Sequence, residues 1–197
     1  MLFAAGIVIT INTGYLWGTQ IVAYASGPQS RLHVPASEIS LAVAISAAVC
    51  LFSILLAGRL SDRFGRRNIA LAGVVLILIT AFPFYWLVDT GQFPLILLAE
   101  CVVWGIWGVL TGPLAALFAE AFAGNVRYTA ASVSYHGGAV IGGAAPVIAT
   151  ILLAYSHQHS WVLSLYVTVC SCISMTCLVL LKDRRDVDLA APAQSSV

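Results

Sequence analysis

The sequence predicts an all-α, polytopic membrane protein with six transmembrane helices, and its composition and charge pattern carry this prediction. Of the 197 residues, 60% are hydrophobic and 9% are charged, against roughly 25% charged residues in an ordinary soluble domain. The charges are clumped, so that five stretches of 19 to 54 residues contain none. Roughly 20 apolar residues cross a bilayer as one helix, and these stretches lack the alternation of membrane strands. Soluble, disordered and nucleic-acid-binding classes are excluded.

Each expected span follows from a charge-free stretch and the polar residues that bound it. The chain begins Met1-Leu2-Phe3 without the basic leader of a signal peptide, so the first stretch is expected to be a retained span. The longest stretch is divided into two spans by the polar residues 156–160. The six expected spans cover residues 2–24, 38–57, 69–88, 94–120, 130–155 and 161–181. Together they form a transmembrane domain over residues 1–182, and residues 183–197 are expected to be a disordered tail.

Lys and Arg residues in the short loops predict the orientation of the chain. With the amino end inside, eight basic residues fall in cytoplasmic segments, and one, Arg31, falls in an outer loop. Short cytoplasmic loops of membrane proteins are enriched in Lys and Arg. Both termini are therefore expected in the cytoplasm, in a multi-pass protein of the cell inner membrane.

The densest group of charges lies between the second and third spans, in the segment Gly58-Arg59-Leu60-Ser61-Asp62-Arg63-Phe64-Gly65-Arg66-Arg67. Glycine tolerates a left-handed backbone, so Gly58 is expected to end a helix and Gly65 to allow a tight turn. Four arginines hold such a loop at anionic lipid. Charge anchoring gives no role to Asp62, which is expected to face a helix amino terminus or pair with a guanidinium.

This decapeptide resembles the G-x-L-x-D-R-x-G-R-R signature of the major facilitator superfamily, found between the second and third helices of each six-helix half. A second group of residues resembles the carboxy-terminal half of metabolite:proton symporters. That group comprises residues 112–116, 119–122, 126–132, Tyr135, 142–143 and Pro146. The resemblance implies one half of a major-facilitator-type bundle. Leu114, His136 and residues 123–125 depart from the family pattern and leave the substrate open.

The resemblance also implies a conformational latch on the cytoplasmic side. In one access state Asp62 would face the amino end of the fifth span near residues 129–132, while Arg66 or Arg63 would reach Glu120. Such a contact closes one side of the membrane while the substrate site faces the other. The alternative is a plain basic anchor. The latch residues are Gly58, Asp62, Arg63, Gly65, Arg66, Arg67, Glu120 and Arg127.

Polar residues inside the first and fourth spans predict a cavity for substrate or proton, because such residues tend to face a cavity or another helix. In each span the polar residues recur at spacings of three and four, which places them on one helix face. The resemblance implies that these two helices line the central cavity. The residues are Asn12, Tyr15, Thr19 and the nearby Gln20 in the first span, and Glu100, Trp104, Trp107 and Thr111 in the fourth.

Two titratable side chains within the spans are candidates for proton coupling. Glu100 is the only carboxylate well within a span, and intramembrane carboxylates form proton relays in transporters. A wetted or structurally paired carboxylate is the alternative. His136 in the fifth span is the second candidate, because imidazole changes its charge near neutral pH. The alternative for His136 is a hydrogen-bonded packing residue.

Glycine and proline residues in the fourth and fifth spans predict close packing and bends. Gly108-x-x-x-Gly112 and Gly138-x-x-x-Gly142 permit close helix approach. Pro113 follows the first pair and Pro146 follows the second, and proline bends a helix. Bent, closely packed helices suit a transporter that rocks between two states.

These observations favour a secondary transporter for a small polar metabolite, such as an organic acid, an amino acid or a betaine, working by proton symport and alternating access. No cofactor and no metal site are expected, and a proton gradient is the expected energy source. Besides substrate, proton and bilayer, the expected partner is a missing amino-terminal half, a separate partner half or a second copy. The alternative is a truncated or degenerate non-transporting membrane protein or scaffold subunit. An enzyme is disfavoured, because no paired carboxylates, nucleophile elbow or metal-ligand cluster share a depth.

Overall fold

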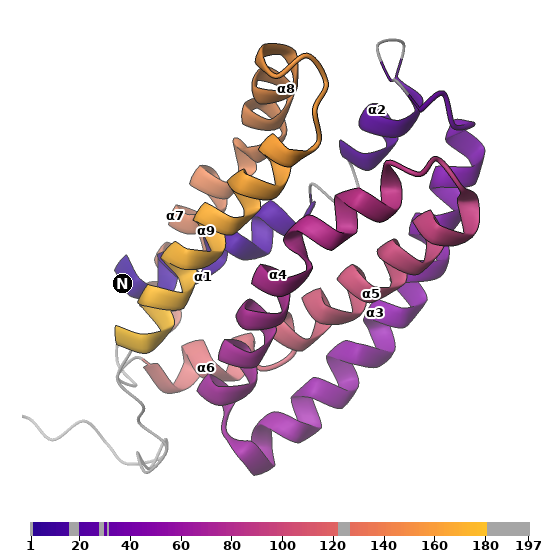
Figure 1. Ribbon diagram of the computed structural model, residues 1–197. Coiled ribbons are helices and arrows are strands. Elements are labelled where there is room, and N and C mark those ends of the chain that lie inside the picture. The colour runs from indigo at the N-terminus through magenta and orange to yellow at the C-terminus, as the bar shows by residue number, and fades with distance from the viewer. Residues whose placement is uncertain (1, 16–19, 28–29, 31, 122–126, 181–197) are drawn as a thin grey trace, which may run out of the picture.

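The computed structural model describes residues 2–15, 20–27, 30, 32–121 and 127–180. In this part of the chain all regular elements are helices, which pack into an elongated bundle (Figure 1). They are α1 (Leu2–Tyr15), α2 (Ile21–Ser26), α3 (Ala36–Phe64), α4 (Arg66–Val88), α5 (Phe93–Thr111), α6 (Leu114–Ala121), α7 (Arg127–Gly143), α8 (Ala145–Tyr155) and α9 (Trp161–Leu180).

Five helical segments of the described chain are long and apolar enough to cross a membrane, and they correspond to the second to sixth expected spans. They expose much of their apolar surface: Phe52 of α3 is 73% exposed and Val140 of α7 is 77% exposed. Apolar surfaces of this kind are favourable in contact with lipid and unfavourable in contact with water. The chain is a multi-pass membrane protein. The five segments are Ala36–Phe64, Arg66–Val88, Phe93–Glu120, Tyr128–Tyr155 and Trp161–Leu180.

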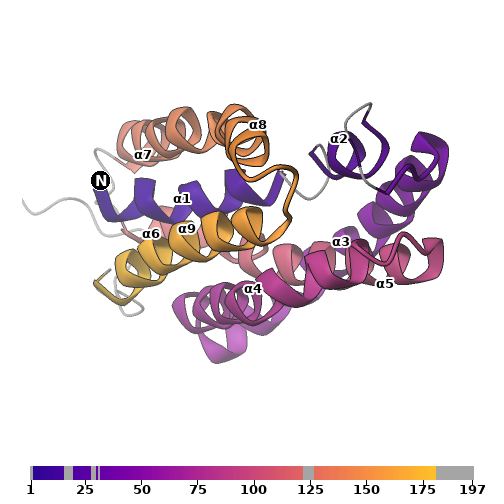
Figure 2. The ribbon, with the colours of Figure 1, turned by 45° about the horizontal axis from the view of Figure 1, so that its top comes forward.

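The first expected span differs from a single helix over residues 2–24. Helix α1 ends at Tyr15 and α2 begins at Ile21, with residues 16–19 outside the described chain. The two helices pack on different partners, because α1 lies between α7 and α9 whereas α2 lies against α3 (Figure 2). The first span is therefore not among the five counted above, and a total of six remains a prediction.

The expectation that Gly58 ends the second span is wrong. Helix α3 continues through Gly58 to Phe64, and the hydroxyl of Ser61 donates to the carbonyl of Gly58 over 2.7 Å. The helix ends at Gly65, whose φ of 94° lies in the left-handed region that glycine tolerates. Because Gly65 is the only residue between α3 and α4, the turn is as tight as predicted.

The helices form two groups that meet along α4 and α9. Helix α5 packs against both α3 and α4, and α1 packs against both α7 and α9 (Figure 2). Helices α4 and α9 are antiparallel, because Ser160, just before α9, donates to Asp89, just after α4, over 2.6 Å. The opposite end of α9 reaches the start of α4.

Close packing between α3 and α5 depends on the glycines of α5, as predicted. A Cβ at Gly108 would lie 2.9 Å from the carbonyl oxygen of Cys50, and a Cβ at Gly112 would lie 2.8 Å from that of Ile54. The hydroxyl of Ser53 donates to the carbonyl of Gly105 over 2.5 Å. Side chains at these positions would push the two helices apart.

Both predicted bends are present. Helix α5 ends at Thr111 and α6 begins at Leu114, so the break contains Pro113. Helix α7 ends at Gly143 and α8 begins at Ala145, immediately before Pro146. Proline removes a backbone donor and its ring clashes with the preceding turn, which bends a helix without ending the span.

Candidate functional site

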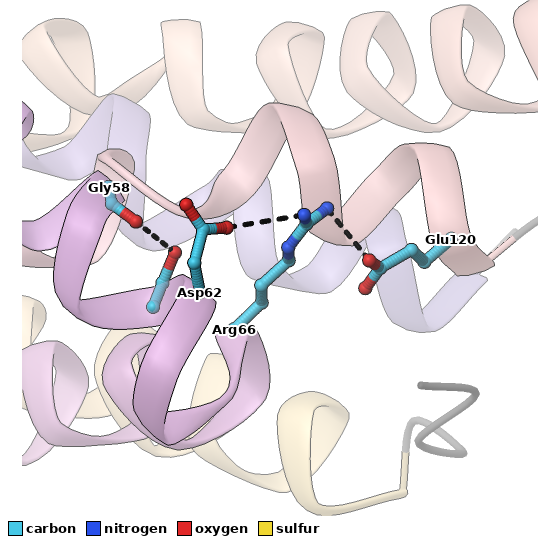
Figure 3. Close-up of polar contacts among 5 residues, drawn as sticks. Gly58, Asp62, Arg66 and Glu120 are labelled. Carbon is cyan, nitrogen blue, oxygen red and sulfur yellow. Dashed lines mark hydrogen bonds and ion pairs between the residues drawn. The ribbon is translucent and has the colours of Figure 1, made fainter. Parts of the chain in front are cut away.

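A cluster of charged side chains lies beside the α3–α4 turn, and we call it the latch cluster: Asp62, Arg66 and Glu120 (Figure 3). Nη1 of Arg66 lies 2.8 Å from Oε1 of Glu120, and Nη2 lies 3.3 Å from Oδ1 of Asp62. Asp62 belongs to the last turn of α3, Arg66 begins α4, and Glu120 lies at the end of α6. One guanidinium thus joins three helices that meet at this end of the bundle.

The two ion pairs of the latch cluster are unequal. The side chains of Arg66 and Glu120 are 27% and 21% exposed, whereas that of Asp62 is 69% exposed. An exposed pair contributes about 0–1 kcal/mol, because water competes for both charges. The Arg66–Glu120 pair is therefore the stronger of the two ion pairs. The family resemblance implies that Arg66 or Arg63 would reach Glu120, and in this structure Arg66 does so.

The other predicted latch residues have separate positions. The guanidinium of Arg63 lies over the ring of Phe64, 5.6 Å from its centroid. Arg67 donates to two carbonyls at the end of α9. Among the described residues Asp62 is hydrogen-bonded to Arg66, and its approach to residues 129–132 in another access state remains a prediction. The side chain of Arg127 lies outside the described residues.

Glu100 lies fully buried in α5 with an incomplete set of partners. Its Oε2 accepts a hydrogen bond from the indole nitrogen of Trp104 over 2.9 Å, while its Oε1 has no hydrogen-bond partner in the described part of the chain. The indole of Trp104 makes an edge contact with that of Trp107 at 5.6 Å between centroids. A buried carboxylate oxygen without a donor is costly in its charged form, so this site suits a carboxyl group that takes up a proton.

A cavity of about 290 Å³ lies between α1, α5, α6 and α7. Two of its lining residues are hydrogen-bonded to each other: the indole nitrogen of Trp107 donates to the carbonyl of Ile11 over 3.0 Å. Gly14 permits this contact, since a Cβ there would lie 2.3 Å from the indole ring. Aromatic and aliphatic groups dominate the wall, with hydroxyls from Thr111 and Tyr135. The lining residues are Ile11, Trp107, Thr111, Leu114, Ala115, Phe118 and Tyr135.

The predicted cavity residues do not all lie together. Trp107 and Thr111 line the cavity, but Glu100 and Trp104 are not among its lining residues. Gln20 lines a separate hollow of about 310 Å³ with Thr150 and Gln158. His136 is exposed on α7, and its ring contacts that of its neighbour Tyr135 at 5.7 Å between centroids. The side chains of Asn12, Tyr15 and Thr19 lie outside the described residues.

Asp89 is a contact point that sequence reasoning missed. The hydroxyl of Tyr24 donates to its Oδ1 over 2.5 Å, and that of Ser160 donates to its Oδ2 over 2.6 Å. These bonds join α2, α4 and the start of α9 at the end of the bundle opposite the latch cluster. The signal that the sequence offers for Asp89 is a lone carboxylate directly after a charge-free stretch, which by itself indicates the end of a span.

Comparison with known proteins agrees with this architecture. Residues 2–196 match the family model of the Major Facilitator Superfamily. The chain is 28% identical over 200 residues to the proline/betaine transporter of Escherichia coli (strain K12), an alignment that covers 100% of this chain and 39% of that protein. It is 31% identical over 158 residues to the citrate-proton symporter of Klebsiella pneumoniae, covering 78% of this chain and 34% of that protein.

A third relative is the shikimate transporter of Escherichia coli (strain K12), which is 27% identical over 135 residues, covering 63% of this chain and 29% of that protein. The chain thus spans well under half the length of these relatives, and it matches their carboxy-terminal half. The family match extends over nearly all of the sequence, and the signature segment forms the α3–α4 turn with its ion pairs. The chain belongs to the Major Facilitator Superfamily.

Proposed function

We propose that this chain supplies one half of a transporter that moves a small polar metabolite across the cell membrane by alternating access and proton symport. The observation that carries the proposal is the contact, 2.8 Å long, between Arg66 of the signature segment and Glu120 at the end of α6. Because the chain covers between 29% and 39% of the length of the three relatives named above, the other helices would come from a longer chain, a partner half or a second copy.

The latch cluster is proposed to lie on the cytoplasmic side, where Lys and Arg residues concentrate. In one access state Arg66 holds α6 against the α3–α4 turn. When the site opens to the cytoplasm, the pair separates and both charges become hydrated. A contact of moderate strength suits this role, because substrate binding can shift an equilibrium only by its differential affinity for the two states.

The substrate class is proposed from the relatives and from the cavity. The named substrates of these relatives are proline and betaine, citrate and shikimate, all small and polar. An organic acid, an amino acid or a betaine is therefore the proposed substrate of this chain. The cavity beside Trp107 is about 290 Å³, at the small end of the usual range for ligand pockets.

Glu100 is proposed as the proton carrier of this half. It is fully buried, and its Oε1 has no hydrogen-bond partner within the described residues, so a bound proton would remove the cost of a buried negative charge. The energy source is then the proton gradient, and no cofactor takes part. Arg66 and Glu120, in contrast, work by electrostatic attraction and need no proton transfer.

Uptake into membrane vesicles tests the proposal. Vesicles from cells that carry the gene would be compared with vesicles from a deletion strain, using labelled proline, glycine betaine, citrate and shikimate. The proposal predicts uptake of at least one compound that depends on the gene and stops when a protonophore collapses the gradient. Gene-dependent uptake that ignores the gradient would contradict proton symport. No uptake of any compound would favour the alternative, a non-transporting membrane protein.

A further inference from the structure

Arg67 contacts a different helix from its neighbour Arg66. Its Nε donates to the carbonyl oxygen of Leu178 over 2.8 Å, and its Nη2 donates to that of Val179 over 2.6 Å. Arg66 turns instead to Glu120 on α6. Two consecutive arginines therefore connect the α3–α4 turn to two separate elements of the bundle.

Helix electrostatics explain why Arg67 reaches α9. The amino terminus of a helix carries a partial positive charge that repels cations, and its carboxyl terminus carries a partial negative charge. Arg66 and Arg67 both stand in the first turn of α4, which contains no acidic residue. Because α9 runs antiparallel to α4, its carboxyl end lies beside this turn. The last carbonyls of a helix lack intrahelical donors, so Arg67 satisfies two of them.

The geometry requires an arginine. A guanidinium presents several N–H groups in a rigid fork, so Nε and Nη2 can meet two successive carbonyls at once. A lysine offers a single ammonium on a flexible stem, and a glutamine offers no charge. The pair of bonds thus fixes both the position and the orientation of the Arg67 side chain.

Helix α9 is itself held in the bundle, so it can serve as a fixed support. The hydroxyl of Ser174 donates to the carbonyl of Gly6 over 2.6 Å, which ties α9 to α1. A Cβ at Gly6 would collide with Sγ of Cys177, so α1 and α9 pack in close contact. Since Arg66 directly precedes Arg67, an anchor at Arg67 also fixes the backbone from which Arg66 extends.

We propose that Arg67 is a positioning residue: it anchors the α3–α4 turn to the carboxyl end of α9 and thereby holds Arg66 in reach of Glu120. The role of the Arg66–Glu120 contact in transport rests on the proposed function, but the anchor itself does not. In this arrangement the turn stays with α9 whether the contact with α6 is closed or open.

Distances between spin labels test this proposal in the purified full-length protein, in a background where the native cysteines are replaced. One label pair, Arg59→Cys with Thr176→Cys, reports the separation of the turn from α9. A second pair, Arg59→Cys with Ala116→Cys, reports the separation of the turn from α6. All three sites lie on the described helices, and both Arg59 and Thr176 are exposed.

Arg67→Gln is expected to broaden both distance distributions by about twofold, because the turn loses its support on α9. Arg66→Gln should broaden only the distribution between the turn and α6. Arg67→Lys keeps the charge but presents its N–H donors on a single nitrogen, so its distributions should fall between those of Arg67→Gln and the unmodified protein. A graded effect of this kind would show that Arg67→Gln does not act through misfolding. Arg63→Gln is the matched control and should leave both distributions unchanged.

Two results would overturn the proposal. In one, Arg67→Gln leaves the separation of the turn from α9 unchanged. In the other, it broadens that separation but not the separation from α6, which would make Arg67 a local structural contact without a positioning role. These distances need no substrate, so the anchor can be established even if vesicles show no uptake.

Discussion

Gly65 determines the geometry of the α3–α4 turn because it alone connects the two helices. Its φ of 94° is a conformation that a Cβ disfavours. We expect Gly65→Ala to destabilise the protein by about 1–3 kcal/mol, measured as a lower midpoint of thermal unfolding in detergent.

Gly58→Ala is the matched control, since a Cβ at Gly58 meets no atom within 4 Å. Gly58 lies inside α3, where alanine is favoured over glycine by about 0.5–1 kcal/mol. The midpoint should therefore rise slightly or stay constant. Equal losses in both variants would contradict the assignment of the turn to Gly65.

The carboxyl group of Glu100 is expected to couple uptake to protons. Glu100→Gln keeps an oxygen that can accept the bond from Trp104 but removes the titrating group. Uptake driven by the proton gradient should fall to the level of vesicles treated with protonophore, while exchange of substrate across the membrane continues. Glu38→Gln, in the first turn of α3, is the control and should keep gradient-driven uptake.

At the scale of single residues, a contact of Glu120 with either Arg66 or Arg63 could be predicted, because these positions belong to recognisable family patterns. The bonds of Arg67 could not, because its partners are backbone carbonyls 111 and 112 residues away. Every residue has a backbone carbonyl, so nothing in the sequence indicates which carbonyls Arg67 will bind. The same holds for Gly14, whose role depends on the position of the Trp107 indole.

At the scale of helices, the glycines of α5 set its distance from α3. Gly108→Ala would place a Cβ 2.8 Å from that of Ser53, within a packed interface. We expect a loss of about 1–3 kcal/mol in the free energy of unfolding, as overpacked cores show, measured by thermal unfolding in detergent.

Gly105→Ala provides the comparison within the same helix. Its Cβ would meet one atom, Cγ1 of Val49, at an ordinary contact distance of 3.6 Å. The unfolding midpoint should stay close to that of the unmodified protein. If Gly105→Ala were as harmful as Gly108→Ala, the close approach of Gly108 to α3 would not explain the loss, because alanine is favoured over glycine inside a helix.

The bounds of most helices could be predicted because charges mark the ends of apolar segments and prolines mark the bends. Two features of the helices could not be predicted in this way. The charge-free stretch up to Ser30 contains no signal that would separate α1 from α2, and their different partners become visible only in the fold. Gly58 resembles a helix end in sequence, but continued hydrogen bonding carries α3 on to Phe64.

At the scale of the whole molecule, two groups of helices meet along α4 and α9. Each end of the interface between α4 and α9 has its own polar contacts. Arg67 binds the end of α9 at one end, and Asp89 accepts bonds from Tyr24 and Ser160 at the other. These contacts hold the two groups together as a unit. If the chain is one half of a transporter, as proposed, this unit is expected to move as one rigid body against the helices of the other half.

Arg66 and Glu120 are proposed to act together as the latch of a transport unit. A double-mutant cycle on substrate uptake tests this proposal most directly, using Arg66→Gln, Glu120→Gln and the combined variant, each with its membrane level measured. If the two residues work only through their mutual contact, the combined variant loses the same factor in uptake as either single variant. Losses that multiply, or full uptake by both single variants, would contradict a latch formed by these two residues.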